Sequence, residues 1–426
     1  MTWAEMAPHD VLMQLYRAAL DAADPLQVIP PLLPPPPLGR TVVVGVGKAA
    51  AAMAQAVEAH WQGPVSGVVV VPEGATRPLR NIRVLTGSHP VPDASSVRGG
   101  DALLQAVSGL HSDDLVIALV SGGGSALCAK PADGLTLEDK QSITKALLLR
   151  GASISEINTV RRHLSAIKGG RLAAAAYPAR VVTLLISDIP GDEPTLIASG
   201  PTLPDASTCA DALAVLQRYG ITHLPAVLES LQAGRWESVK PGDARLAANT
   251  HAVVASAWDG MQAASRKAAS LGLACHILSD AMEGEARDLA KAHAAIALSV
   301  AQHDVPFKAP CVLISGGEAT VTVRGKGRGG RNTEFALAMA LALKDQKGVQ
   351  RILALSAGTD GLDGKADAAG AWINDQTLAL GAQRGLSALQ CLDGNDSASF
   401  LDAAGTLVHT GPTFTNINDF RAVLIL

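Results

Sequence analysis

TVVVGVGKAAAAMAQAVEAH, residues 41–60, starts with an apolar run, turns through two glycines and continues as an alanine-rich segment. An uninterrupted β-branched run is typical of a strand buried on both faces, and the segment after the turn has the composition of a helix. Its GVGKAA portion fits G-x-G-x-x-A, a turn that binds dinucleotides when it lies between a strand and a helix. Residues 41–60 therefore predict the first strand and helix of an α/β sheet.

The order of an apolar run followed by a glycine-containing turn recurs four more times. The further runs are DLVIALV (114–120), RVVTLLI (180–186), PCVLI (310–314) and RILAL (351–355). Such runs alternating with helical stretches are typical of parallel α/β sheets, in which ligands bind beyond the carboxyl ends of the strands. We therefore expect an α/β fold with largely parallel sheets flanked by helices, and ligand contacts in the five turns.

The length of the chain predicts more than one domain. Its 426 residues, of which 48% are hydrophobic, are enough for two cores, and we expect the active site in a cleft between two domains. LQAGRWESVKPGDARLAANTH (231–251) is rich in Gly, Pro and charge, so we place the boundary near residue 240, between domains 1–240 and 241–426. A helix is expected at about residues 9–24, before a stiff proline-rich connection.

Charge and composition argue against a nucleic-acid or membrane surface. Lys and Arg number 35 against 39 Asp and Glu, a net charge of −4, and no long basic run offsets it. Aromatic residues make up only 3%, too few for base-stacking platforms. The sequence shows neither a signal-peptide pattern at its start nor a stretch of ~18 apolar residues, so we expect a cytoplasmic protein.

The cysteines lie far apart in the sequence and form no C-x-x-C pair. This spacing favours buried thiols in a reducing compartment over a disulfide framework or a zinc site. The five residues are Cys128, Cys209, Cys275, Cys311 and Cys391.

Two of the glycine turns are candidates for phosphate binding. In GVGKAA, Gly45 and Gly47 precede Lys48, whose ammonium group would add to the positive end of the helix dipole; an ordinary turn with a surface lysine is the alternative. SGGGSAL provides consecutive small residues whose amides and hydroxyls can face an anion. These residues are Ser121, Gly122, Gly123, Gly124 and Ser125. Neither turn is a P-loop, and the sequence has no protein-kinase catalytic loop.

GKGRGGRNTEF, residues 325–335, gathers three positive charges among glycines directly before an apolar helical stretch. Gly329 and Gly330 precede Arg331, which would lie at the start of that helix, where an anion is favoured. A solvated loop whose charges aid solubility is the alternative. Of the three basic residues, Arg331 is the one that we expect to take part in chemistry, in preference to Lys326 and Arg328.

Two acidic turns offer ligands for Mg²⁺ or a base for a substrate hydroxyl. SDIPGDEP carries Asp188, Asp192 and Glu193, and TDGLDG carries Asp360 and Asp363. Helix capping and turn formation are the alternative roles for each aspartate.

Two further segments contain polar residues that have either a structural or a functional role. His89, in TGSHPVPD, is favoured as a loop hydrogen-bonding group over a base. INTVRRHLSAIKGGRLA (157–173) is expected to be one helix with a basic stripe, either solvated or lining an anionic site. The stripe consists of Arg161, Ser165, Lys168 and Arg171.

These motifs together resemble the class II glycerate 2-kinases, whose C-terminal half is the MOFRL domain. In order they are TGSHPVPD, LVSGGGSAL, RRHLSAIKGGRLA, SDIPGDEPTLIASGPT, SGGEATVTVRGKGRGGRNTEFALA and SAGTDGLDG, and the similarity runs from about residue 40 to about residue 420. The resemblance implies a Rossmann-like glycerate kinase domain (1–240) and an α/β MOFRL domain (241–426). It implies phosphorylation of D-glycerate at the 2-hydroxyl by ATP with Mg²⁺, without nucleic-acid or membrane partners; a homodimer is left open. Members have often been labelled hydroxypyruvate reductases, so an NAD(P)-dependent reductase is the alternative.

The resemblance also assigns roles to individual residues. Lys48 and Arg331 correspond to the lysine and arginine of the family's cleft. We expect Lys48 on the transferring phosphoryl group, the amides of residues 121–125 on phosphates, and Arg331 on phosphate or the glycerate carboxylate. Asp192 is the expected base or metal orienter. Secondary candidates for substrate, ribose or metal contact are Glu318, Asp360 and Lys168, and the metal candidates are Asp188 and Asp192.

Overall fold

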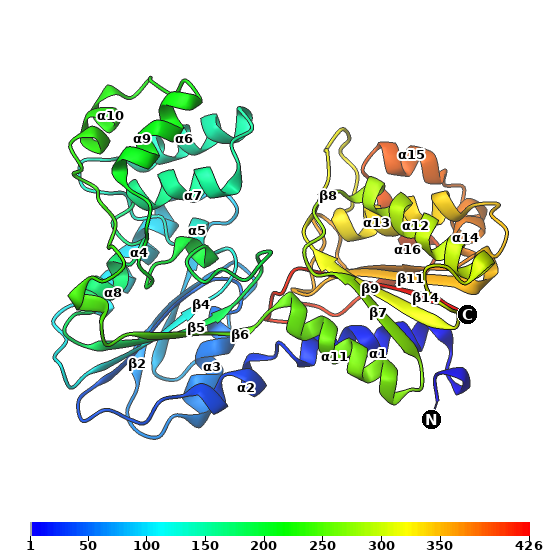
Figure 1. The fold of residues 1–426 in the computed structure, drawn as a ribbon, viewed down its shortest axis with the longest axis horizontal. Helices are drawn as coiled ribbons and strands as arrows, with labels where there is room; N and C mark the ends of the chain where they lie inside the picture. The colour runs from blue at the N-terminus through cyan, green and yellow to red at the C-terminus, as the bar shows by residue number, and fades with distance from the viewer. Residues whose placement is uncertain (1) are drawn as a thin grey trace. The chain divides into compact units, whose positions relative to one another are not determined.

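The computed structural model describes residues 2–426, which divide into two compact units. The first unit comprises residues 25–187 and 192–254. The second unit comprises the residues before 25, residues 188–191 and residues 255–426. Each unit is built on one six-stranded sheet (Figure 1).

The sheet of the first unit has the strand order β3-β2-β1-β4-β5-β6. All six positions of the central strand β1 are buried, and it pairs in parallel with β2 and β4. The pairs β2–β3 and β4–β5 are also parallel, as expected for apolar runs joined by helices. The strands are β1 (Thr41–Val46), β2 (Ser66–Pro72), β3 (Ile82–Gly87), β4 (Leu115–Val120), β5 (Arg180–Ile186) and β6 (Thr250–Ala255).

Helices cover both faces of this sheet, and a separate helical group extends from one of them (Figure 1). α3 packs on β1 and β2 from one face, while α4 and α8 lie over the other. The helical group α6, α7, α9 and α10 has its own apolar core, which includes Ile143, Val160 and Leu216. The helices are α2 (Pro25–Val28), α3 (Ala50–His60), α4 (Ala94–Ala106), α5 (Gly124–Leu127), α6 (Leu137–Leu149), α7 (Ile154–His163), α8 (Arg171–Ala176), α9 (Cys209–Arg218) and α10 (Pro225–Gln232).

The sheet of the second unit is mixed, which corrects the expectation of a largely parallel sheet. Its order is β13-β12-β11-β14-β9-β7, and of these pairs only β7–β9 is parallel among the described residues. β14, an apolar strand, inserts between β9 and β11 and runs antiparallel to both, and β12 is antiparallel to β11 and β13. The strands are β7 (Ala274–Ser279), β9 (Cys311–Gly317), β11 (Ile352–Gly358), β12 (Gly370–Ile373), β13 (Leu407–Val408) and β14 (Asp419–Ile425), with a separate pair β8 (Gly284–Glu285) and β10 (Ala319–Thr320).

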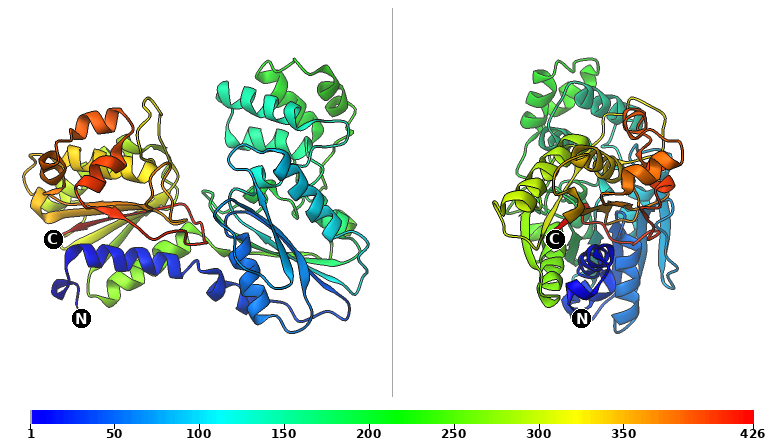
Figure 2. Two further views of the ribbon diagram at one scale, coloured as in Figure 1. Left: turned by 180° about the vertical axis from the view of Figure 1, so that it is seen from behind. Right: turned by 90° about the vertical axis from the view of Figure 1, so that its right-hand side faces the viewer.

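Two helical layers enclose this second sheet. Figures 1 and 2 show α1 and α11 side by side on one face and α12 and α13 on the other. Each face has its own apolar core, one around Leu12 and Ile314 and one around Phe335 and Val423. Among residues 2–426, no helix is both long and apolar enough to cross a bilayer. The helices are α1 (Pro8–Asp21), α11 (Ala257–Ser270), α12 (Ala286–His303), α13 (Arg331–Leu343), α14 (Thr377–Gln383), α15 (Ala388–Asp393) and α16 (Ser397–Ala403).

The compact units differ from the predicted division into residues 1–240 and 241–426. The expected N-terminal helix is present as α1, but it packs on α11 and β14 of the second unit. Its Tyr16 hydroxyl donates to the carbonyl of Gly358 at 2.7 Å inside that unit. Residues 250–254 in turn belong to the first unit, because β6 completes the first sheet. An amphipathic helix does not reveal from its own sequence which sheet it will cover.

The single helix expected over residues 157–173 is wrong. The segment forms α7, which ends at His163, and α8, which begins at Arg171. Gly169 and Gly170, directly before α8, have φ of 59° and 80°, a left-handed conformation that one continuous helix does not contain. The basic residues of this segment therefore share no helical stripe.

Candidate functional site

The turns after β1 and β4 are hydrogen-bonded to each other at the carboxyl ends of the two strands. Lys48 lies between β1 and α3, as predicted, and its backbone N–H donates to the carbonyl of Gly122 at 2.9 Å. The hydroxyl of Ser121 accepts from the N–H of Ala49 at 3.0 Å. Gly47 has φ 129°, and a Cβ there would lie 2.2 Å from the Ser121 hydroxyl oxygen, so this close approach requires glycine. The two predicted phosphate-binding turns thus form one structure.

Three strand ends converge at Gly123. This glycine has φ 81°, and a Cβ built on it would lie 3.3 Å from His89 Nε2 and 3.5 Å from Lys48 Cγ. His89 follows β3, Lys48 follows β1 and Gly123 follows β4. A lysine, a histidine and glycine amides therefore gather at one edge of the sheet. His89, expected to be a loop hydrogen-bonding group, lies within the candidate site.

The loop after β5 closes another side of the same turn. The hydroxyls of Ser125 and Ser199 are 2.7 Å apart, and Ser199 has the left-handed φ of 62°. A Cβ on Gly124 would lie only 2.5 Å from Cβ of Ala198. Asp192, in the same loop and half-buried, also has a positive φ, 51°. Left-handed backbone at non-glycine residues is strained and concentrates at functional sites.

In the second unit, two carboxylates hold Arg331 at the first residue of α13. Its Nε donates to Asp419 Oδ1 at 2.8 Å, and one terminal nitrogen donates to Glu318 Oε1 at 2.7 Å. Burial opposes the charge of Arg331, but Asp419 and Glu318 together raise its pKa above the ordinary value. The structure therefore pairs Arg331 with Glu318, a secondary candidate, and fixes the plane of the guanidinium group.

Asp419 is a component of this site that sequence reasoning missed. Its side chain is fully buried and also accepts from Asn332 Nδ2 at 2.9 Å and from Arg421 at 2.7 Å. The only signal in the sequence was a pair of charged residues at the start of the apolar run DFRAVLI. Because buried charges are costly unless paired, that pair could have marked a hydrogen-bonded site.

Asp363 has the structural role that was the alternative for each aspartate. It is buried and accepts from the N–H groups of Asn332 and Thr333 at 2.9 and 2.8 Å, which caps the start of α13. A Cβ on Gly330 would lie 2.4 Å from an Asp363 carboxylate oxygen. Packing against this cap therefore explains Gly330 without a ligand.

The glycines of the basic loop have a similar packing role. A Cβ on Gly325 would lie 2.1 Å from the carbonyl oxygen of Gly394, and one on Gly329 would lie 2.5 Å from the Ser397 hydroxyl oxygen. The loop therefore lies directly on the segment before α16. Arg328 is half-exposed and pairs only loosely with Asp402, at 3.7 Å.

The metal candidate Asp188 lies among amide side chains of the second unit. Its Oδ2 accepts from Asn416 Nδ2 at 3.0 Å, and its backbone carbonyl accepts from Asn418. The carbonyl of Asn418 accepts from the N–H of Thr359 at 2.9 Å, next to Asp360. Asp360 Oδ1 accepts from the N–H of Leu362 at 3.1 Å, as in a turn.

Lys168, predicted as a secondary substrate contact, is only 2% exposed. Its ammonium group donates to the carbonyl of Cys128 at 2.9 Å, directly after α5. Lys168 therefore contacts the backbone behind the glycine turn.

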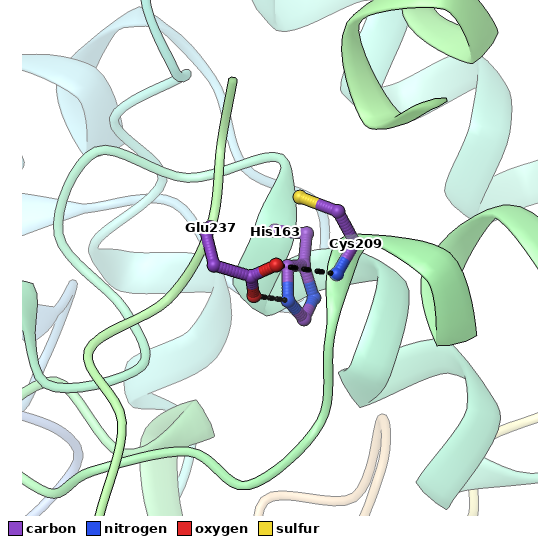
Figure 3. Close-up of side chains that lie close together, drawn as sticks. All are labelled: His163, Cys209 and Glu237. Carbon is purple, nitrogen blue, oxygen red and sulfur yellow. Dashed lines mark hydrogen bonds and ion pairs between the residues drawn. The ribbon is translucent and has the colours of Figure 1, made fainter. Parts of the chain in front are cut away.

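A cluster of potential metal ligands lies in the helical group of the first unit (Figure 3). The ligand atoms of His163, Cys209 and Glu237 lie within 4.8 Å of one another. His163 Nε2 is 3.2 Å from Glu237 Oε1, which is also 2.5 Å from the ammonium group of Lys240. The other oxygen of Glu237 accepts from the backbone N–H of Cys209 at 3.2 Å. Because Lys240 already balances the carboxylate, we interpret the cluster as an ion-pair network that ties α7 to the segment around residue 237.

All five cysteines are free thiols, and four of them are buried. This confirms the prediction of buried thiols for those four residues, whereas Cys275 is partly exposed. The position of Cys209 beside His163 and Glu237 could not be read from cysteine spacing, because its neighbours come from distant parts of the sequence.

Two family models match the chain. The model described as "Domain of unknown function (DUF4147)" matches residues 11–232, and the one described as "MOFRL family" matches residues 311–419. The D-glycerate 2-kinase of Thermotoga maritima is 39% identical over 416 residues, which cover 97% of each chain. A protein of Agrobacterium vitis, named provisionally as a hydroxypyruvate reductase, is 47% identical over all of this chain and 96% of its own. A crystal structure of glycerate kinase from Thermotoga maritima matches with a TM-score of 0.87 and 38% identity, covering 98% of this chain and 99% of that one.

Proposed function

The chain belongs to the family defined by the DUF4147 and MOFRL domains, and from that premise we propose that it phosphorylates D-glycerate at the 2-hydroxyl with ATP. The products are 2-phosphoglycerate and ADP. The observation that carries the proposal is the convergence of Lys48 with the glycine turn of residues 121–125 at one sheet edge. Glycine amides and a cation are the groups that hold nucleotide phosphates.

Phosphoryl transfer requires positioning of the acceptor and stabilisation of charge on the phosphoryl oxygens. In our proposal the amides of residues 121–125 hold the nucleotide phosphates, while Lys48 stabilises the charge that develops on the transferring group. Arg331 binds phosphate or the glycerate carboxylate, because its guanidinium plane is already fixed by Asp419 and Glu318. Asp192 accepts the proton of the 2-hydroxyl as the bond to phosphorus forms.

The carboxylate of Asp188 is a candidate ligand for Mg²⁺. This hard cation prefers oxygen ligands, and one oxygen of this carboxylate already accepts from the amide nitrogen of Asn416. We propose Asp188 as one of its ligands, because Asp192 has the role of base. When bound with ATP, Mg²⁺ neutralises charge on the phosphate oxygens.

The reductase alternative is not favoured. Hydride transfer to a carbonyl does not need a lysine and an arginine beside glycine turns, whereas phosphoryl transfer does. The relatives that carry a kinase name match nearly the whole chain, among them the D-glycerate 2-kinase of Thermotoga maritima.

One paired assay tests the proposal. Purified protein is incubated with D-glycerate, ATP and Mg²⁺, with ADP release coupled to an optical readout, and in parallel with hydroxypyruvate and NADH. We expect glycerate-dependent ADP release and no NADH oxidation. NADH oxidation without ADP release would overturn the kinase function.

A further inference from the structure

Two buried lysines donate to three consecutive backbone carbonyls directly after the glycine turn. Lys168 donates to the carbonyl of Cys128 at 2.9 Å. Lys140 donates to the carbonyls of Ala129 and Lys130, both at 3.3 Å. Lys168 and Lys140 are 2% and 7% exposed, so both ammonium groups are held away from bulk water. Burying a charged lysine is costly unless the charge is paired and the ammonium group is hydrogen-bonded.

No carboxylate compensates these two ammonium groups. Among residues 2–426, neither lysine forms an ion pair, and the nearby guanidinium groups of Arg161 and Arg171 have the same sign of charge. Asp101, the acidic group that influences this region, is paired with Lys130 at 2.7 Å. The Cys128 thiol supplies no negative charge either, because burial raises its pKa. The region behind the turn therefore carries uncompensated positive charge.

Hydrogen bonds connect the anchored carbonyls to the turn itself. Cys128 is the C-terminal cap of α5, and its N–H donates to the carbonyl of Gly124 at 3.1 Å. The N–H of Leu127 donates to the carbonyl of Gly123 at 3.3 Å. One helical turn thus links Lys168 to the residues that we propose hold phosphate. A shift of Cys128 would move Gly123 and Gly124 with it.

We propose that Lys168 and Lys140 are positioning residues for nucleotide binding, which fix the turn of residues 121–125 from behind and supply the positive charge that favours a polyphosphate there. This inference rests on the proposed kinase function. Neither lysine needs to touch the nucleotide, because electrostatic attraction acts over several ångströms in a region shielded from water. When nucleotide is bound, its negative phosphates compensate this positive charge.

Proton uptake on nucleotide binding is the specific consequence. Burial lowers the pKa of Lys168 to about 8, and the positive charge of Arg161 adds to this lowering. Burial and the charge of Lys168 also lower the pKa of Lys140 well below its ordinary value. Polyphosphate bound nearby favours the protonated ammonium groups and raises both pKa values. At a pH near 8, nucleotide binding should therefore be accompanied by proton uptake at these two lysines.

The experiment is calorimetric titration of the full-length protein with MgADP at pH 8, in two buffers that differ in ionisation enthalpy. The protons taken up on binding are released by the buffer. We therefore expect the apparent binding enthalpy of the wild type to differ between the two buffers in proportion to the difference in their ionisation enthalpies. Lys168→Met should lose most of the uptake and weaken MgADP binding by about tenfold or more. Lys168→Arg keeps a fixed charge and should retain affinity without the uptake. Lys145→Met, an exposed residue of the same helix as Lys140, should behave as wild type.

The wild-type titration tests the proposal even if Lys168→Met fails to fold, and Lys140→Met offers a second variant. Buffer-independent binding enthalpy in the wild type, or equal uptake in wild type and Lys168→Met, would overturn the inference. In either case glycerate-dependent ADP release by the wild type would leave the kinase function intact. Absence of both ADP release and MgADP binding would instead remove the proposed function.

Discussion

Replacing Arg331 with lysine tests whether the geometry of the guanidinium group, in addition to its charge, matters for the proposed reaction. Arg331 donates from two different nitrogens to Asp419 and Glu318, at 2.8 and 2.7 Å. A lysine has a single donor group at the end of a flexible chain, so it can retain the buried Asp419 contact but cannot reproduce the fixed plane. The positive charge remains, whereas its orientation toward a substrate oxygen is lost.

The loss can be expressed as a change in rate. One charge-assisted hydrogen bond is worth about 1.5–3 kcal/mol. At ~1.4 kcal/mol per factor of ten, its loss in the transition state lowers kcat/KM by about 10- to 150-fold. Thermal stability should change little, because the Glu318 side chain is half-exposed and a lysine still neutralises Asp419.

The assay is glycerate-dependent ADP release, with the unfolding temperature measured on the same samples. Arg328→Ala is the matched control, because Arg328 lies in the same loop, is half-exposed and forms only a 3.7 Å ion pair. It should remain within about twofold of wild type. The reasoning is refuted if Arg331→Lys keeps wild-type kcat/KM while Arg328→Ala loses activity.

Three further predictions follow from the same contacts. Lys48→Ala should lower kcat by ~10²-fold, about 3 kcal/mol, with little change in nucleotide KM, since charge builds up mainly in the transition state; a large KM effect at unchanged kcat would instead make Lys48 a ground-state ligand. Gly123→Ala should weaken MgADP binding in titration calorimetry, because φ 81° and the 3.3 Å approach of His89 strain any side chain, and unchanged affinity would exclude Gly123 from the phosphate turn. Hydrogen bonds from Lys240, Cys209 and His163 outweigh burial and lower the pKa of Glu237 from 4.5 to about 2, so its stabilising effect is complete above pH 4.5 and is lost as pH falls toward 2. Urea unfolding at a series of pH values should show this loss in wild type and not in Glu237→Gln; parallel curves would contradict the ion-pair network.

The parts of the fold that the sequence predicted are those with local signals. β1, β4 and β5 are apolar runs buried on both faces; β4 and β5 form strands within a residue of the predicted bounds, and β1 extends two residues beyond the apolar run TVVV (41–44). Lys48 and Ser121 could be placed together because both follow such strands, and carboxyl ends of neighbouring parallel strands meet at one edge. The hydrogen bond between the two turns is a direct result of that topology.

The parts that the sequence did not predict depend on partners far away along the chain. Asp419 holds Arg331 across 88 residues, and no local pattern links them. The second sheet is mixed because β14 inserts antiparallel between β9 and β11 and because β12 pairs antiparallel with β11 and β13, and these pairings are decided by tertiary packing. The break between α7 and α8 was the exception, since two consecutive glycines, Gly169 and Gly170, were a visible local sign against one continuous helix.

The discontinuity of the second unit has a consequence for synthesis. α1 leaves the ribosome long before α11 and β14, against which it packs, so its apolar face has no native partner while residues 25–254 are made. The first unit can complete its sheet once β6 has emerged, whereas β9 and β11 stay apart until residues 419–425 arrive to join them. The order of translation therefore favours a folded first unit carrying an undocked helix, and emergence of residues 419–425 becomes the event that allows the second core to close.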